Sequence, residues 1–285
     1  MRGGRSIWSA GWSRFRRNRL AMAGAVTVLI LYLAAVFAPM LTPYDPVSHG
    51  RLPEMRHQPP SREHLLGTDK FGRDVLTRIV YGARVSLTVS FLAVALSVVL
   101  GSVTGAVAGY SGGVVDAALM RIVDALMSIP RLFLMLTCIA LFSRSMLLVI
   151  VLLGATGWMG TARLVRGQIL SLRSREFVSA AEALGAGGGR IVLRHLIPNT
   201  ITVIIVSATL KIGLIILVEA SLGFLGLGVP PPTPSWGMMV YEGREVLLDA
   251  WWVSTFPGLA IIVTVVGYNL LGDGLRDSFD PIQFT

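Results

Sequence analysis

The stretch VSLTVSFLAVALSVVLGSVTGAVAGYSGGVV, residues 85–115, contains no charged side chain. A helix needs about 20 consecutive apolar residues to cross the hydrocarbon core of a bilayer, so this stretch is long enough to span a membrane. Similar uncharged runs cover residues 20–44, 145–162 and 250–272. Only 14% of the 285 residues are charged, whereas soluble domains carry about a quarter charged residues. The sequence therefore predicts an all-α integral membrane protein.

The apolar runs and the connections between them predict six transmembrane helices. We place these spans at residues 20–40, 86–109, 119–142, 146–164, 199–222 and 251–272. Basic residues favour the cytoplasmic side, and their distribution predicts that both termini lie inside, although the arginines of residues 51–84 weaken the bias. We divide the chain into residues 1–84 with the first span and an external loop, a five-helix core at 85–275, and a cytoplasmic tail at 276–285.

A basic N-terminal segment contributes to the net charge of +9 at pH 7. Its arginines precede the first span (Arg2, Arg5, Arg14, Arg16, Arg17 and Arg19), and Trp8, Trp12 and Phe15 recur among them at helical spacing. A short helix with an aromatic face and a basic remainder is typical of segments that lie on an anionic cytoplasmic leaflet. We therefore expect the lipid bilayer, and not nucleic acid, to be the partner of this segment.

The external loop, residues 41–84, has two halves of different character. Prolines make the first half irregular. In the second half, Phe71, Val75 and Ile79 fall at helical spacing with polar residues opposite them, which predicts an amphipathic helix at the outer membrane surface. The loop also carries His49, His57 and His64, whose wide spacing in an irregular segment favours solvated side chains over metal ligands.

A second polar segment, residues 163–198, lies on the cytoplasmic side of the predicted topology. Phe177, Ala180, Ala181 and Leu184 follow the spacing of a helix with a narrow apolar face. The glycine-rich stretch at 185–189 ends this helix, because glycine is the favoured C-terminal stop. A second short helix at 190–196 then leads to Pro198, which suits the start of the next span. The product is a helix–bend–helix element in the cytoplasm.

The glycine-rich stretch does not predict a nucleotide site. A phosphate loop requires a lysine directly after a glycine, and neither Lys70 nor Lys211 follows one. A dinucleotide fingerprint that starts at Gly185 would need a glycine where Arg190 stands. We therefore expect this chain to bind no cofactor of its own.

An enzyme is the most distant alternative. Gly109-Tyr110-Ser111-Gly112 matches the G-x-S-G of rhomboid-type intramembrane serine proteases. Such a serine needs a histidine base within hydrogen-bond reach, and His195 and the histidines of the external loop all lie outside the predicted spans. We therefore predict that the chain is not an enzyme.

The cytoplasmic segment resembles the EAA loop of the membrane subunits of bacterial ATP-binding-cassette importers. The loop, at 175–198, has Ala180 and Ala181, then Gly185, and Pro198 at the spacing of the family pattern. Ser179 stands where the family has glutamate, and His195 and Ile197 also depart from the pattern. The spacing, the two alanines, the glycine and the proline carry the resemblance.

Further stretches resemble the C-type permease of the dipeptide, oligopeptide and nickel group. They are HLLGTDKFGRDVLTRIVYGARVSL at 64–87, AGYSGGVVDAALMRIVDALMSIP at 108–130, EASLGFLGLGVPPPTPSW at 219–236 and GDGLRDSFDP at 272–281. The resemblance implies a type I importer permease fold in the inner membrane of a prokaryote. The expected function is ATP-driven import of di- or oligopeptides, with nickel, glutathione or an opine-like solute as the alternative.

The resemblance also implies partners. These are a homologous second permease in a heterodimer, two ATPase subunits that bind ATP and Mg²⁺, and an extracytoplasmic substrate-binding protein. The EAA loop would dock into the ATPase as a coupling element through Phe177, Ser179, Ala180, Ala181, Leu184, Gly185, Arg190, Arg194 and Pro198. Arg190 and Arg194 would pair with acidic groups of the ATPase or else face the leaflet.

Charged residues within the predicted spans need partners or a polar cavity. Asp124 and Arg131 share one face of the third span, and we interpret them as structural. Glu219 and Lys211 lie near one face of the fifth span. They lie along the translocation path, or they form an ion pair between helices or extend towards a membrane interface. The proline-rich segment at 224–249 would meet the binding protein or anchor the chain through Trp236 at headgroup depth.

Overall fold

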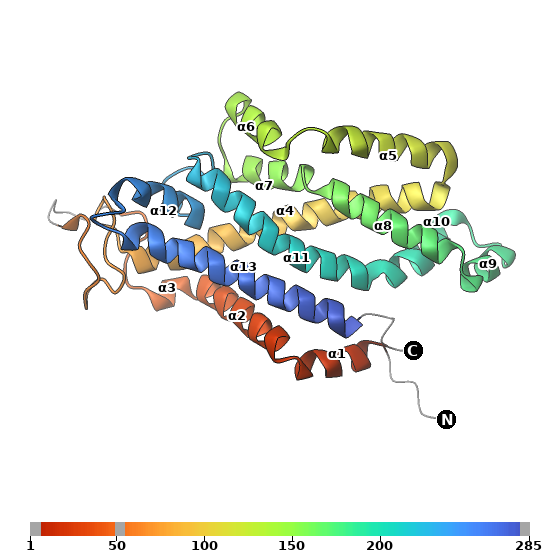
Figure 1. The fold of residues 1–285 in the computed structure, drawn as a ribbon, viewed down its shortest axis with the longest axis horizontal. Helices are drawn as coiled ribbons and strands as arrows, with labels where there is room; N and C mark the ends of the chain where they lie inside the picture. Colours follow the sequence, from red (N-terminus) through yellow and green to blue (C-terminus); the bar gives the residue numbers. More distant parts are fainter. Residues whose placement is uncertain (1–6, 49–54, 280–285) are drawn as a thin grey trace. The chain divides into compact units, whose positions relative to one another are not determined.

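The computed structural model describes residues 7–48 and 55–279, and their side chains from residue 11 onward (Figure 1). The described residues are almost entirely helical. The helices are α1 Ile7–Arg17, α2 Arg19–Val36, α3 Ala38–Leu41, α4 Val75–Ser111, α5 Gly113–Met127, α6 Arg131–Leu141, α7 Met146–Ala155, α8 Trp158–Arg173, α9 Glu176–Ala183, α10 Gly188–Ile191, a π-helical turn at Val192–Leu196, α11 Ile197–Phe224, α12 Trp236–Gly243, a 3₁₀ turn at Arg244–Val246, and α13 Trp252–Phe279.

Five helical stretches of the described residues are long and apolar enough to cross a membrane. They are Arg19–Val36, Val75–Ser111, Met146–Arg173, Gly188–Phe224 and Trp252–Phe279. The span expected at 119–142 is not one straight helix, because α5 and α6 meet at an angle of 77°. Pro130 lies at this break, where its missing N–H cannot continue a helix. The described chain thus has five candidate spans, or six if the bent pair crosses as one.

The separate amphipathic helix expected at the outer surface is not present. Residues 75–84 form the first turns of α4, which continues without a break to Ser111. The polar side of this segment does not face water either, since Thr77 and Arg78 are 0% and 2% exposed. The sequence pattern was misleading because charged residues of the external loop and α12 pair with these polar groups inside the protein.

The chain forms two compact units, and each has its own core. The first consists of residues 1–91, 142–150 and 209–285. Within it α2 runs beside α13, and α12 packs on α13 as well (Figure 1). Leu87, Ile216, Trp236 and Tyr268 lie in one buried cluster of this unit. α2 and α13 lie close together at small residues. A Cβ added at Gly24 would lie only 2.7 Å from the carbonyl oxygen of Gly267, so a larger residue would not fit there.

The second unit consists of residues 92–141 and 151–208. A close helix contact within it joins the second half of α4 to α8 through Gly101, Gly105 and Gly109. A Cβ added at Gly101 would lie 2.7 Å from the carbonyl oxygen of Trp158, and one at Gly109 would lie 2.9 Å from that of Arg166. Small residues at four-residue spacing allow membrane helices to approach backbone to backbone. The sequence carries this G-x₃-G-x₃-G signal, which our sequence analysis missed.

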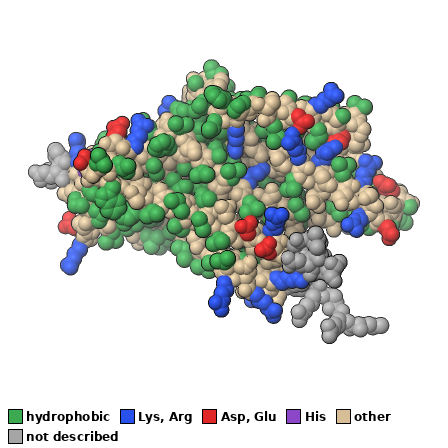
Figure 2. Space-filling model, in the orientation of Figure 1, with side chains coloured by type: hydrophobic (Ala, Val, Ile, Leu, Met, Phe, Trp, Pro, Cys, Tyr) green, Lys and Arg blue, Asp and Glu red, His purple; other side chains and the backbone are tan. Residues whose placement is uncertain are grey.

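The surface agrees with burial in a bilayer. Large apolar side chains are exposed along the candidate spans, among them Ile30 at 58%, Val103 at 60% and Ile262 at 58%. In the space-filling view, hydrophobic side chains cover a broad part of the visible face (Figure 2). Large exposed apolar areas mark contact with a membrane or a partner protein.

Candidate functional site

The cytoplasmic bend begins where α9 ends. Gly185 has a φ of +78°, a conformation that L residues with a side chain rarely adopt. Its N–H donates to the carbonyl oxygen of Glu182 at 2.9 Å, and the N–H of Ala186 donates to that of Ala181 at 3.0 Å. This pair of hydrogen bonds is a Schellman motif, which satisfies the last carbonyls of a helix and reverses the chain. The predicted helix stop at Gly185 is therefore confirmed.

The remaining glycines have a different role from the one expected. Gly187 is extended and precedes α10, while Gly188 and Gly189 already belong to that helix. A π-helical turn at Val192–Leu196 then joins α10 to α11. The stretch Gly188–Phe224 is a single candidate span, and Pro198 lies in the first turn of α11. The second short helix is thus the beginning of the membrane helix itself.

The inner side of the bend is fixed to the rest of the second unit. Val178 and Ile191 are 1% and 0% exposed and belong to a buried cluster with Val165 and Ile169 of α8. A Cβ added at Gly188 would lie 2.7 Å from a ring carbon of Tyr110, at the end of α4. The bend is therefore held in place by α4 and α8 and is not a loose loop.

The outer side of the bend is apolar and exposed. Leu184 is 89% exposed and Leu193 is 74% exposed, with Phe177 at 40%. Ser179, Ala180, Gly185, Arg190, Arg194 and Pro198 are also exposed. Of the expected apolar stripe, only Ala181 points inward, at 8% exposure. Leu193 also belongs to this exposed apolar set, and the sequence analysis did not identify it. We call Phe177, Leu184 and Leu193 the outer face of the bend.

Glu219 lies in the core of the first unit. Its side chain is 0% exposed, and Oε2 accepts a hydrogen bond of 3.2 Å from the hydroxyl of Ser86. The same hydroxyl oxygen accepts from the backbone N–H of Trp236 at 3.3 Å, so α4, α11 and α12 meet at one point. Lys211, two turns earlier on α11, is partly exposed. The assignment of Glu219 and Lys211 to a translocation path stays a prediction.

Trp236 is buried, with 1% exposure, and its indole N–H donates to the carbonyl oxygen of Ile79 at 3.0 Å. The idea that this tryptophan anchors the chain at headgroup depth is therefore wrong. Close backbone contact explains the burial, because a Cβ added at Gly237 would lie 2.6 Å from the carbonyl oxygen of Ala220. α12 is thus packed back onto α11.

The acidic residues of α5 pair with α8. Asp116 accepts two hydrogen bonds of 2.5 Å from the guanidinium of Arg166, and Asp124 forms an ion pair with Arg163. Asp124 was expected to share a face with Arg131. Instead Arg131 donates to the hydroxyl of Thr156 and to the carbonyl oxygen of Leu153, each at 2.9 Å. The bend between α5 and α6 separates the two residues that a straight helix would align.

A charged network is buried at the start of α4. Asp69 accepts from Arg73 at 2.7 Å and from Arg78 at 2.5 Å, and Glu242 of α12 accepts from the same two arginines at 3.2 and 2.6 Å. Burial raises the pKa of Asp69, but the charges of Arg78 and Arg73 and backbone hydrogen bonds from Arg73 and Phe71 outweigh it. The pKa of Asp69 is therefore lower than the ordinary value, and the carboxylate stays ionised.

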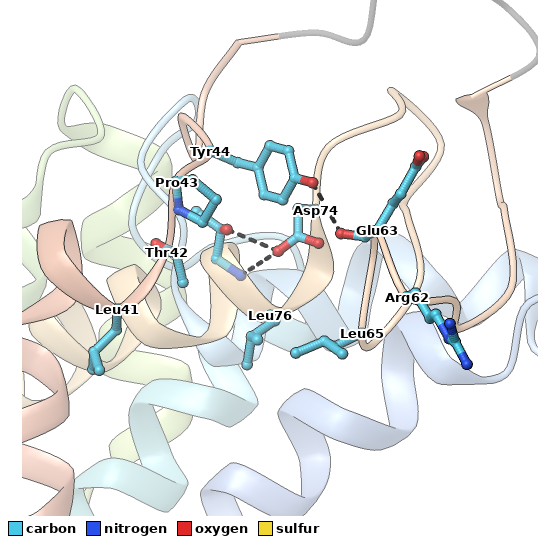
Figure 3. A pocket seen from close by; sticks show the side chains of 10 residues that line it. Leu41, Thr42, Pro43, Tyr44, Arg62, Glu63, Leu65, Asp74 and Leu76 are labelled. Carbon is cyan, nitrogen blue, oxygen red and sulfur yellow. Dashed lines mark hydrogen bonds between the residues drawn. The ribbon is translucent and has the colours of Figure 1, made fainter.

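A cavity of about 280 Å³ lies between the end of α3 and the external loop (Figure 3). The hydroxyl of Tyr44 donates to the carbonyl oxygen of Glu63 at 2.9 Å across it, and Asp74 accepts from the N–H and hydroxyl of Thr77 at 2.7 Å. Asp74 also contacts Nδ1 of His64 at 3.0 Å. Its oxygens are thus engaged within the protein.

The expectation of solvated histidines is wrong for His64, which is 5% exposed. Its contact with the buried Asp74 explains why it leaves the solvent. His57 is partly exposed, and His49 lies outside the described residues. Among the residues that the structure describes, no three His, Cys, Asp or Glu side chains gather as a metal site would require.

Comparison with known proteins gives the class of protein to which this chain belongs. Residues 97–283 match the family described as "Binding-protein-dependent transport system inner membrane component", and residues 6–60 match "N-terminal TM domain of oligopeptide transport permease C". A solved structure of the MetNI methionine ABC transporter in inward-facing conformations aligns with a TM-score of 0.54 and 19% identity. It covers 71% of this chain and 97% of that chain, and shows the fold alone.

Relatives of similar length are also close in sequence. The chain is 41% identical over 276 residues to the dipeptide transport system permease protein DppC of Alkalihalophilus pseudofirmus, covering 97% of this chain and 90% of that protein. It is 39% identical to the oligopeptide transport system permease protein OppC of Bacillus subtilis, again covering 97% of this chain and 90% of that protein. It is 41% identical to the glutathione transport system permease protein GsiD of Escherichia coli, covering 97% and 91%.

The helical fold and its candidate spans define a multi-pass protein of the inner membrane. The chain belongs to the family of binding-protein-dependent transport system inner membrane components.

Proposed function

We propose that this chain is one permease subunit of an ATP-driven importer of di- or oligopeptides. The names of the relatives DppC and OppC support the substrate class. The observation that carries the proposal is the cytoplasmic bend, whose inner side is buried and whose outer face is apolar and exposed. Leu184 lies beyond the candidate spans and Leu193 at the start of one, so a partner protein that covers this end of the bend accounts for their exposure.

The partner at the outer face is an ATPase subunit that binds ATP and Mg²⁺. The bend docks through Phe177, Ser179, Ala180, Ala181, Leu184, Gly185, Arg190, Arg194 and Pro198. Ala181 contributes from the inner side, where its small side chain lets α9 lie close to α8. Arg190 and Arg194 are exposed and pair with acidic groups of the ATPase.

The bend is suited to transmit movement because it has no joint with α11. α10, the π-helical turn and α11 form one continuous helical stretch from Gly188 to Phe224. A displacement of α10 by the ATPase therefore moves the cytoplasmic end of α11 directly. In this way ATP hydrolysis by the partner drives alternating access, and this chain performs no covalent chemistry.

The topology that fits this role has six crossings with both termini inside. It requires the bent pair α5 and α6 to cross as one span and places α9 and α10 in the cytoplasm. A second, homologous permease forms the other half of the path, and a second ATPase docks on it. An extracytoplasmic binding protein delivers the substrate to the side of α12.

Glutathione is the second candidate substrate, because the relative GsiD is as similar to this chain as DppC is. Glutathione is itself a small peptide, so the two candidates share the same chemistry.

Uptake assays test the proposal. Cells with and without this chain are compared for uptake of a labelled dipeptide, a pentapeptide, glutathione and nickel ion. We expect loss of one or more peptide activities and unchanged nickel uptake. Unchanged uptake of all three peptides with lost nickel uptake would contradict the proposal. A plasmid copy of the gene restores uptake if the loss is specific.

A further inference from the structure

Arg131 occupies the place where two neighbouring helical stretches are interrupted. It is the first residue of α6, directly after the 77° bend from α5. Its partners Leu153 and Thr156 lie at the junction of α7 and α8, where Ala155 ends one helix and Trp158 begins the next. The guanidinium therefore sits at two adjacent breaks within candidate membrane spans.

The guanidinium is held in position by neutral groups. Nε donates to the hydroxyl oxygen of Thr156 and a terminal nitrogen donates to the carbonyl oxygen of Leu153, both at 2.9 Å. The Thr156 hydroxyl in turn donates to the carbonyl oxygen of Leu152 at 2.6 Å, which fixes it as an acceptor for Arg131. An arginine has five N–H donors, so these two bonds orient the group and leave further donors available.

No acidic side chain of the described residues pairs with Arg131. The acids of α5 are already engaged, Asp116 with Arg166 and Asp124 with Arg163. Arg131 is partly exposed and is therefore not sealed within the described chain. A charge within a membrane span is costly and normally faces a water-filled cavity or an opposite charge. The structure thus presents an oriented cation without its anion.

The depth of Arg131 argues against a lipid phosphate as that anion. The junction beside Arg131 follows the 10 residues of α7 and precedes the 16 residues of α8. At about 1.5 Å per residue, it lies roughly 15 Å along the helix axis from the start of the predicted span at residue 146 and roughly 11 Å from its end at residue 164. Lipid headgroups lie at the ends of a span, so a solute in the membrane interior fits better.

We infer that Arg131 binds a carboxylate of the transported solute, namely the C-terminal carboxylate of a peptide. This inference rests on the proposed function and names a residue of the path. The planar guanidinium matches a carboxylate through paired N–H donors, which a lysine cannot reproduce. Binding in the middle of interrupted spans is also the arrangement that other membrane transporters use for charged substrates.

The test compares two peptides in the complete importer reconstituted in proteoliposomes. One peptide has a free C-terminal carboxylate and the other is its C-terminal amide, and both are supplied with the binding protein. For each peptide, uptake by a variant is divided by uptake by the wild type. Any preference of the binding protein cancels in this ratio, because it is common to both proteins.

Arg131→Gln should lower uptake of the free peptide about tenfold, the typical loss for one charge-assisted interaction, and leave the amide unchanged. Arg131→Lys should retain part of the activity. Thr156→Val keeps the charge but removes the orienting hydrogen bond, so it should give a smaller loss confined to the free peptide. Unchanged amide uptake shows in each case that the complex is assembled.

Equal losses for the two peptides in all three variants, or no loss at all, would overturn the inference. Equal losses would mean that Arg131 pairs with an acid of another subunit, and peptide import would still stand. If the wild type transports neither peptide, the proposed function fails, and the carboxylate assignment fails with it.

Discussion

Arg78 and Glu242 are 164 residues apart in the sequence, yet they form an ion pair of 2.6 Å with side-chain exposures of 2% and 8%. Through Arg78 the first turn of α4 is joined both to α12 and, at 2.5 Å, to Asp69 of the external loop. Buried ion pairs contribute little when intact but are costly to break, because one charge is then left without a partner. The pair therefore fixes where α12 lies on α4.

Asp69→Asn should destabilise the protein by about 3–5 kcal/mol, the usual cost of removing one partner from a buried ion pair. Asp69 has a pKa below its ordinary value of 3.8, so its ionised form stabilises the fold above pH 3.8. This contribution is lost as the pH falls through the lower pKa of the folded state. The melting difference between wild type and variant in detergent should be constant above pH 3.8 and shrink below it.

The control for this prediction is Lys70→Gln, because Lys70 is exposed and adjacent to Asp69. Surface substitutions of this kind change stability by no more than about 0.5 kcal/mol. A melting difference for Asp69→Asn that grows on acidification would contradict the assigned pKa direction.

Glu219→Ala should destabilise the first unit by about 1–3 kcal/mol, because it leaves the buried hydroxyl of Ser86 without its acceptor. Glu219→Gln keeps the size and an acceptor oxygen, so it should melt close to the wild type. Melting temperature and peptide uptake are measured together. If Glu219→Gln is stable but loses uptake, Glu219 has a role in the path and not only in packing.

The bend and the spans were predictable from sequence because local rules determine them. The apolar runs located the helices, and Gly185 was identified as the helix stop that its positive φ confirms. Long-range pairing was not predictable. Arg78 pairs with the nearby Asp69 but also with Glu242, 164 residues further along the chain. Without knowledge of this distant partner, the polar side of residues 73–78 is predicted to face solvent. The break at Pro130 was indicated by the proline itself, but the apolar residues on both sides of it suggested one continuous helix.

Gly185→Pro should leave membrane insertion intact and uncouple ATP hydrolysis from transport. Proline fixes φ near −65°, whereas Gly185 requires +78°, and proline also removes the N–H that bonds Glu182. Gly185→Ala is a milder variant with a strain of about 1–2 kcal/mol. The ratio of peptide imported to ATP hydrolysed measures the effect.

Gly187→Ala is the matched control, since Gly187 has a φ of −67° and no atom within 4 Å of an added Cβ. It should keep the wild-type ratio. Normal transport by Gly185→Pro would refute the docking role of the bend.

Leu184→Asp should weaken assembly with the ATPase about tenfold or more, as expected when a central apolar contact is replaced by a charge. Leu184 is 89% exposed, so the free permease should melt like the wild type. Copurification of the ATPase in detergent measures assembly, with Leu184→Met as the control. Retention of the ATPase at the wild-type level would place its contact elsewhere.

Gly101, Gly105 and Gly109 restrict how the second unit is able to change shape during transport. At these glycines the backbone of α4 lies directly against α8, including the side chains of Thr161 and Ile169, so a shift in register would press larger residues of α4 into this contact. The second half of α4 and α8 therefore travel as one piece. If the proposed alternating access is correct, we expect the second unit to bend where its helices are already interrupted, at the α5–α6 bend and the α7–α8 junction.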